Sequence, residues 1–329
     1  MKKNALIALS LAFTINAQAA FFVEDGQIKA EVQTYSRNNQ KIVLIDMVHV
    51  GPKSYYKAVS SVMKQFENSN ALILQEGVRH CENKGDIIML PGEKADFQIL
   101  EQLYEQRLVI NPEAAREELL AAGFVEKKCL QDSTLEEPGF IERLSSRFSL
   151  YGLIAGVAFL RSQGTISDLY PDKIKLASGD IASARFTNVV EKAAAGSIVH
   201  CLLSLKAKGG CIQFREWSKS ETAKKIQEDI IIDRRNDVLL GITFNSLNIT
   251  SEYGSGYRLS NTQNSFDTVI LPWGAAHMPG GLLEAIEKMG FVKSKKEGVV
   301  YTSCKRFNKN IILNAILSQQ GTIKADCQQ

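Results

Sequence analysis

Short apolar runs bounded by turn residues predict the strands of a buried sheet. Three of them cover residues 42–45, 71–74 and 269–271, and runs of this length between turn signals are typical of buried strands. A helical pattern over about 55–67, with Ser54 in the N-cap position, separates the first two. A strand–helix–strand unit of this length favours a right-handed parallel crossover. The first two strands are therefore expected to end at the same edge of one sheet.

The third apolar run belongs to the stretch around which the rest of the chain is organised. This stretch, 267–281, reads DTVILPWGAAHMPGG, and its strand ends near Gly274, shortly before His277. Glycines and a proline then lead into an amphipathic helix that Gly290 stops. His277 is thus predicted where a strand becomes a helix. Ligands bind at such carboxyl ends of strands in open α/β sheets.

The remaining pattern predicts a mixed sheet with helices around it. Alternating residues 21–35 indicate a hairpin at the start, and 291–295 with 299–304 indicate a closing hairpin. Residues 80–170 show helical patterns and little strand signal. These patterns cover residues 95–108, 112–123 and 139–162. The predicted fold class is α/β, with a mixed central sheet, flanking helices and a helical insertion or cap between the two halves of the sheet.

The N-terminus carries the features of an export signal. Two lysines and a short apolar run precede Ala17-Gln18-Ala19, a small-x-small cleavage site. We interpret residues 1–19 as a secretory signal peptide and residues 20–329 as one mature domain. The apolar run is too short to span a bilayer, so no stable membrane span is expected after cleavage. The predicted location is periplasmic or secreted.

Cysteine content and net charge agree with an exported globular protein. All six cysteines follow the signal peptide, and an even number in an oxidising compartment favours disulfides. Pairing between sequence neighbours would join 81 with 129, 201 with 211 and 304 with 327, although six cysteines allow fifteen connectivities. The net charge of +3 offers no global attraction to nucleic acid.

Three potential metal ligands follow the three predicted strands. His49 and Glu76 come after the first two, and His277 comes after the third. Two imidazoles and a carboxylate are a usual ligand set for a divalent transition metal with open positions. Such a metal would lower the pKa of a bound water and supply a nucleophile for hydrolysis. The other histidines are interpreted as a loop residue, His80, and a structural helix residue, His200.

A long helix late in the chain carries a second group of candidates. It is expected to run from a capping box at Ser218 to about Phe244. Arg235 falls on its apolar stripe and needs an anionic partner, because an unpaired buried charge costs several kcal/mol. Arg235 and Asn236 are candidate catalytic and substrate-binding residues that would steady a carbonyl or carboxylate oxygen, and a structural ion pair is the alternative for Arg235. Asp180 is most simply a cap, with a role at the metal as the alternative.

The motifs resemble those of the TraB/GumN family, which includes the Tiki metal-dependent proteases. That family is marked by two GxxH motifs. The second is intact here and runs from Gly274 to His277. The first keeps its histidine, His49, but has Asp46 in place of the glycine. Asp46 would either add a ligand or crowd the site and mark a non-catalytic member.

Two further features extend the resemblance. Glu76 fits the family's acidic position after the first motif, and Arg235-Asn236 fits its late Arg-Asn pair, with Arg234 where an acidic residue commonly precedes the pair. The resemblance implies an α/β fold shared with erythromycin-esterase-like and haem-uptake ChaN-like proteins. It also implies a divalent metal, with manganese, cobalt and zinc as candidates, and peptide-bond hydrolysis.

Three hypotheses on function follow. The first is an exported metal-dependent hydrolase, a peptidase whose divalent ion is held by His49, Glu76 and His277 and in which Glu76 is also catalytic. The second is a catalytically inactive periplasmic binding protein for a peptide or a small ligand such as haem, which Asp46 motivates. The third is a metal-free esterase that uses His49 and Glu76 as acid–base groups.

Overall fold

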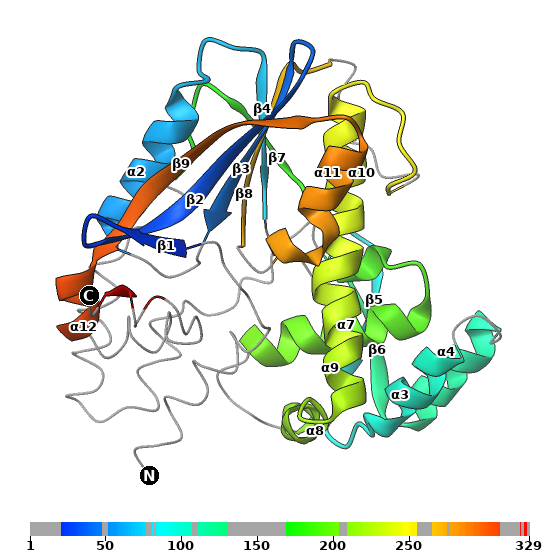
Figure 1. Ribbon diagram of the computed structural model, residues 1–329. Helices are drawn as coiled ribbons and strands as arrows, with labels where there is room; N and C mark the ends of the chain where they lie inside the picture. The colour runs from blue at the N-terminus through cyan, green and yellow to red at the C-terminus, as the bar shows by residue number, and fades with distance from the viewer. Residues whose placement is uncertain are drawn as a thin grey trace. The chain divides into compact units, whose positions relative to one another are not determined.

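The fold is α/β, as predicted: a seven-stranded mixed sheet flanked by helices (Figure 1). The structure is a computed structural model, and it describes residues 21–47, 52–76, 81, 83–106, 111–130, 169–203, 209–254, 265–274, 277–309, 323 and 326–327. Several sequence predictions lie outside these residues. They are the signal peptide at 1–19, His49, His80 and the helix at 139–162.

Four parallel strands form the centre of the sheet. In spatial order they are β3 (Gln40–Met47), β8 (Thr268–Gly274), β4 (Ala71–Gln75) and β7 (Lys175–Ser178). β8 lies between β3 and β4 and pairs with both of them in parallel. All residues of β8 are buried, as expected for a strand covered on both faces. The three strands predicted from apolar runs therefore share one carboxyl edge.

An antiparallel part extends the sheet beyond β3. β1 (Phe21–Glu24) and β2 (Gln27–Arg37) form the predicted first hairpin. Its central residues, Asp25 and Gly26, have φ values of 51° and 66°, the two positive angles that a type I′ turn requires. β2 also pairs with β3 and with β9 (Val292–Ser303).

β9 is one continuous strand, so the predicted closing hairpin is wrong. Its segment KSKKEG looked like a turn because it is charged and contains glycine. In the structure this segment stays extended along β2, where Lys293 and Lys296 form ion pairs with Glu31 at 3.3 and 3.0 Å. Charged residues on an outer strand also discourage pairing with other chains.

Helix α2 (Lys53–Lys64) covers one face of the sheet and shares a core cluster with it, which includes Tyr55 and Ile270. The helix begins after Pro52, its N-cap, so the prediction of Ser54 as cap is wrong. A proline suits a helix start because the first N–H groups of a helix have no partner within it. Ser54 lies inside the first turn.

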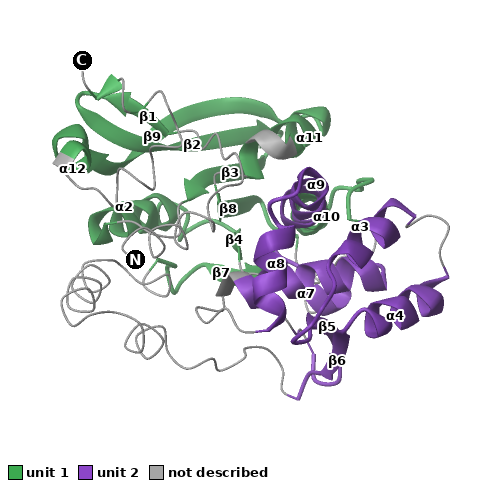
Figure 2. Cartoon of the chain, turned by 90° about the horizontal axis from the view of Figure 1, so that it is seen from below, with its two compact units in different colours: residues 1–76, 156–179, 236–329 green, residues 77–155, 180–235 purple. Residues whose placement is uncertain are grey.

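Figure 2 colours the two compact units into which the chain divides. Unit 1 comprises residues 1–76, 156–179 and 236–329 and contains the seven-stranded sheet. Unit 2 comprises 77–155 and 180–235, and its first segment overlaps the predicted insertion. The boundary between Arg235 and Asn236 falls within one helix, α10 (Arg234–Ser246).

Unit 2 is mainly helical. Its described helices are α3 (Gln98–Glu105), α4 (Pro112–Ala121), η2 (Ser183–Arg185), α7 (Val189–Leu203), α8 (Gly210–Trp217), α9 (Glu221–Glu228) and the π-helical turn η3 (Asp229–Asp233). It also contains an antiparallel pair, β5 (Ile87–Pro91) and β6 (Phe124–Lys128). This strand pair was not predicted, because its short apolar run lies among longer helical patterns.

The helix that carries Arg235 and Asn236 begins later than predicted. Ser218 caps the end of α8, and Ser220 is the N-cap of α9, where its hydroxyl accepts a hydrogen bond from the Ala223 N–H at 3.1 Å. The predicted capping box at Ser218 is therefore wrong. The helix then continues through the turn η3 into α10. Such π-helical turns inside α-helices often occur at functional sites.

Three disulfides join sequence neighbours, which confirms the simplest of the predicted pairings. They are Cys81–Cys129, Cys201–Cys211 and Cys304–Cys327. The first two lie in unit 2 and the third in unit 1. Among the described helices, none has the length and apolar content that crossing a membrane would need.

The disulfides should differ in their contributions to stability. Cys81 and Cys129 are 48 residues apart, whereas Cys201 and Cys211 are 10 apart. Loop-closure entropy then gives upper values of about 4 and about 2.7 kcal/mol for the free energy of unfolding. We expect the double serine variant at 81 and 129 to be less stable than the one at 201 and 211 in urea unfolding. Equal losses would contradict the loop-length argument.

Candidate functional site

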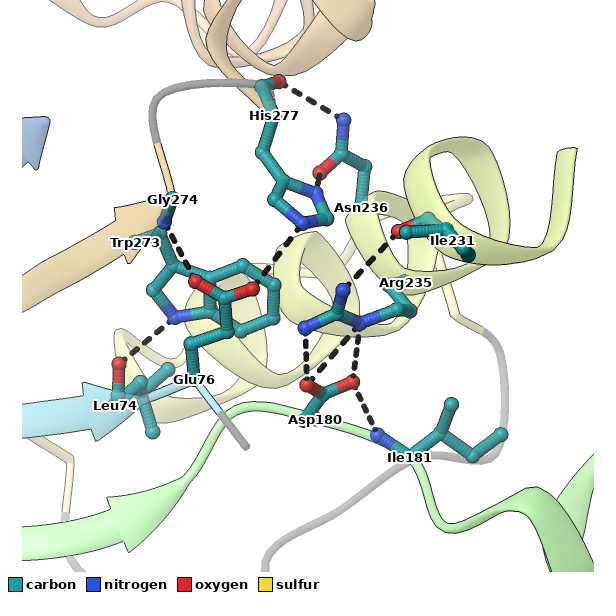
Figure 3. Close-up of polar contacts among 10 residues, drawn as sticks. All are labelled: Leu74, Glu76, Asp180, Ile181, Ile231, Arg235, Asn236, Trp273, Gly274 and His277. Carbon is teal, nitrogen blue, oxygen red and sulfur yellow. Dashed lines mark hydrogen bonds and ion pairs between the residues drawn. The ribbon is translucent and has the colours of Figure 1, made fainter. Parts of the chain in front are cut away.

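Glu76 and His277 meet at the carboxyl edge of the parallel strands, in unit 1. Glu76 directly follows β4, and His277 follows β8 by three residues (Figure 3). The Nε2 atom of His277 lies 3.5 Å from the Oε1 atom of Glu76. Both side chains are shielded from solvent, with exposed fractions of 2% and 10%. The structure thus brings together two of the three predicted metal ligands.

The backbone of β8 holds the Glu76 carboxylate. The Gly274 N–H donates a hydrogen bond to Oε2 at 2.6 Å, which leaves Oε1 facing the imidazole. A Cβ atom at Gly274 would lie 3.0 Å from Oε2, closer than side chains normally approach. The glycine of the intact GxxH motif therefore allows the close approach of Glu76.

Asn236 holds the ring of His277 from the other side. Its Nδ2 donates to the His277 carbonyl oxygen at 3.0 Å, which turns its Oδ1 toward the ring, 2.8 Å from Nδ1. Because Oδ1 can only accept, the proton of a neutral ring must be on Nδ1. The lone pair of the neutral ring is then on Nε2, the atom that faces Glu76.

Trp273 connects the strands beneath this pair. Its Nε1 donates to the Leu74 carbonyl oxygen at 2.9 Å, which ties β8 to β4 just before Glu76. Its ring packs edge-on against the imidazole of His277, with the ring centroids 5.0 Å apart. Trp273 is fully buried, so both strand ends are held at a fixed separation.

The facing atoms of Glu76 and His277 fit a shared cation. An ionised carboxylate oxygen and an unprotonated Nε2 both present lone pairs. Two such acceptors at 3.5 Å repel each other unless a positive charge joins them, and either a proton on Nε2 or a divalent metal supplies it. Nitrogen and oxygen ligands bind zinc at about 2.0–2.2 Å, so one ion can bind both atoms at this separation.

The third predicted ligand, His49, lies outside the described residues, but the strand before it ends at this edge. β3 runs parallel to β8, with Met47 opposite Gly274. The Tyr55 hydroxyl donates to the Asp46 carbonyl oxygen at 2.9 Å and fixes this end of β3. Among the described residues, no three His, Cys, Asp or Glu side chains form a group that could hold a metal ion.

Asp46, which replaces the motif glycine, is fully buried within β3. In the strand register, Asp46 lies opposite Trp273 of β8. Asp46 is on the same face of β3 as Ile42, four residues earlier, and Ile42 lies opposite Tyr35 of β2. Burial, together with the negative charges of three carboxylates, raises the pKa of Tyr35 to about 12. These carboxylates are Glu287, Glu31 and Asp46. The Asp46 charge thus acts on the sheet face that carries Tyr35.

Arg235 has the anionic partner that its apolar stripe requires, within unit 2. Its Nε donates to both oxygens of Asp180 at 2.9 and 3.1 Å, and its Nη2 donates to Oδ2 at 2.6 Å. Its Nη1 donates to the Ile231 carbonyl oxygen, in the turn η3, at 3.3 Å. The side chains are 7% and 0% exposed. A direct role for Arg235 toward a substrate stays a prediction.

Asp180 is this partner, and the prediction that it caps a helix is wrong. The next described helix, η2, has Ala182 as its N-cap, and Asp180 accepts from the Ile181 N–H at 2.9 Å. Both oxygens of the Asp180 carboxylate thus accept hydrogen bonds, from Arg235 and from the Ile181 N–H, and a role of Asp180 at a metal stays a prediction. His200 lies half-buried in α7, beside the Cys201–Cys211 disulfide.

Two neighbours of Glu76 were not predicted from the sequence. Trp273 directly precedes the GxxH motif, but a tryptophan in a buried strand is first interpreted as a core residue. Its hydrogen bond to Leu74 depends on the strand order, which the sequence does not show. Tyr170 precedes β7, and burial together with the negative charge of Glu76 raises its pKa to about 12. Nothing in its sequence context marks Tyr170 as close to Glu76.

The chain was compared with protein-family models, curated proteins and solved structures, and none of them matches it. The resemblance to the TraB/GumN family therefore depends on the motif residues themselves. Of these, Gly274, His277, Glu76 and Asn236 lie in contact within unit 1.

Proposed function

We propose that the protein is an exported hydrolase that uses a divalent metal, bound by Glu76 and His277, to cleave peptides. The observation that carries the proposal is the orientation of the two side chains. Asn236 directs the lone pair of His277 toward Oε1 of Glu76 at 3.5 Å, and the Gly274 N–H fixes the carboxylate. A site that points two acceptors at one position is suited to a cation.

The chain supplies the support that metal ligands need. Histidine ligands usually bond through their second ring nitrogen to a group that fixes their orientation. Asn236 has this role for His277, and it is 3% exposed. His49 is proposed as the third ligand, because β3 and β8 leave the sheet side by side and both motif histidines follow within three residues.

A divalent ion at this position would act as a Lewis acid and activate water for hydrolysis. The residues around it would orient the reaction. Glu76, which the Gly274 N–H holds, is placed to take a proton from water or to pass one on to a leaving amine. Burial of the pair excludes bulk water and strengthens each electrostatic interaction.

Peptide substrates and a location outside the cytoplasm are the finer parts of this proposal. Peptide cleavage follows from the resemblance to the Tiki proteases. Export is supported by the signal-like N-terminus and by the three disulfides, which form in oxidising compartments.

Metal removal tests the proposal. We expect the purified mature protein to contain about one divalent ion per chain by elemental analysis and to cleave members of a peptide library. Exhaustive chelation should abolish cleavage, and adding back Mn²⁺, Co²⁺ or Zn²⁺ should restore it. Product formation that survives chelation would contradict the metal mechanism and favour the metal-free esterase.

Asp46 gives the second candidate function a specific basis. Asp46, a fully buried carboxylate, stands where the first GxxH motif of the TraB/GumN family has glycine. Such a change favours a protein that binds a peptide or haem without turnover. Retention of a ligand, with no product over a long incubation of the metal-loaded protein, would support this function over hydrolysis.

A further inference from the structure

A polar groove lies in unit 1, at the end of the sheet opposite to Glu76 and His277. It has a volume of about 560 Å³. Its lining includes Gln40, the first residue of β3, whereas the Glu76–His277 pair lies beyond the last residues of β4 and β8. β3 spans seven steps of about 3.3 Å, so the groove and the pair are roughly 20 Å apart along the strands. The proposed metal site does not include this groove.

Three turns build the walls of the groove, and each one is held by hydrogen bonds. The Asn248 N–H donates to the Asn245 carbonyl oxygen at the end of α10, at 2.9 Å. The Gly290 N–H donates to the Glu287 carbonyl oxygen at the end of α11 (Leu283–Lys288), also at 2.9 Å. Gln40, beside the β2–β3 turn, donates from Nε2 to the Leu247 carbonyl oxygen at 2.5 Å. The groove is therefore preformed, which reduces the entropic cost of binding.

The charges in the groove are positive. Arg37 and Lys288 line it, and its described lining residues include no aspartate or glutamate. Lys288 forms an ion pair with Glu252 at 2.8 Å, but both side chains are about two-thirds exposed, and such surface pairs are weak. Within the described part of the chain, no ion pair involves Arg37. Asn38, Asn248 and Thr250 add uncharged hydrogen-bonding groups.

We propose that this groove binds a small ligand through an oxyanion, a phosphate or a carboxylate group. The guanidinium of Arg37 offers paired N–H donors that match two oxygens of such a group, and Lys288 adds a second positive charge. The side-chain amides of Asn38 and Asn248 would bond to the remaining oxygens or to hydroxyl groups of the ligand. Binding here is independent of the proposed metal and of hydrolysis.

Titration of the mature protein with inorganic phosphate and, separately, with succinate tests this site. We expect saturable shifts of the backbone amide NMR signals of Asn38, Asn248 and Gly290 with at least one of the two anions. The anion that binds more tightly, phosphate or succinate, shows whether the groove recognises a phosphate or a carboxylate group. Shifts that rise linearly without saturation for both anions would overturn the proposal.

Matched variants distinguish a site from general charge attraction. Arg37→Gln and Lys288→Gln should each weaken binding at least 10-fold, whereas Lys57→Gln, which removes an exposed positive charge from α2, should leave it unchanged. Thermal unfolding shows whether each variant is folded. If Arg37→Gln does not fold, the effect of Lys288→Gln on anion binding decides the test. Equal weakening by Lys57→Gln and the groove variants would show that the groove has no specific site.

Discussion

Replacing Glu76 with glutamine should abolish metal binding and reduce peptide hydrolysis by roughly 1,000-fold. Glutamine keeps an oxygen that can accept the Gly274 N–H, so the strand ends should stay in place. It loses the negative charge that faces Nε2 of His277. A metal contributes several kcal/mol to the transition state, and each 1.36 kcal/mol is a factor of ten in rate. Elemental analysis and the rate of peptide cleavage measure the two effects.

Two further variants test whether the effect of Glu76→Gln is specific to the proposed metal site. Asn236→Ala should weaken metal binding by about 10–100-fold, because it removes the support of a ligand and leaves the ligand itself in place. Glu67→Gln, which alters a carboxylate elsewhere in unit 1, should have no effect on metal content or rate. Glu76→Gln with full activity would remove Glu76 from the mechanism.

Replacing Asp180 with alanine should destabilise the protein by about 3–5 kcal/mol. The change leaves the guanidinium of Arg235 buried without its carboxylate, and breaking one side of a buried ion pair has costs of this size. The free energy of unfolding in urea measures the loss. Glu216→Gln breaks the exposed pair with Lys219 and should change stability by less than about 1 kcal/mol.

The double variant Arg235→Met with Asp180→Leu separates charge from packing. Apolar side chains of similar size can replace a buried ion pair with little loss, so the double variant should be more stable than Asp180→Ala alone. If it is stable and still hydrolyses peptides, Arg235 acts only in the fold. If it is stable but inactive, Arg235 also acts on the substrate.

Three of the four central parallel strands, β3, β4 and β8, could be predicted because they are short apolar runs that end at clear turn residues. The fourth, β7, could not, because its sequence KLAS is no apolar run and none of its residues is buried. The position of β8 between β3 and β4 could not, since strand order depends on contacts between distant segments. The continuous strand β9 was not predicted because two of its lysines, Lys293 and Lys296, form ion pairs with Glu31 on β2, a partner that the local pattern does not show. The start of α9 was misplaced because Ser218 and Ser220 are both suitable caps.

The site was predictable as far as it depends on strand ends. Glu76 and His277 were expected together because both follow buried parallel strands, and they lie 3.5 Å apart. The sequence also showed that Arg235 needs an anion, but many acids were available and only the fold selects Asp180. The amide of Asn236 bonds to His277 at both ends, a contact that was not predicted, and its role toward substrate stays a prediction. That contact depends on the placement of α10, which residue spacing does not determine.

The central claim is that Glu76 and His277 share one divalent ion, and anomalous diffraction tests it most directly. Crystals of the mature protein grown with Zn²⁺ would be measured at the zinc absorption edge. We expect one anomalous peak at about 2.0–2.2 Å from both Nε2 of His277 and Oε1 of Glu76. A direct hydrogen bond between the two side chains, with no peak beside them, would contradict the claim.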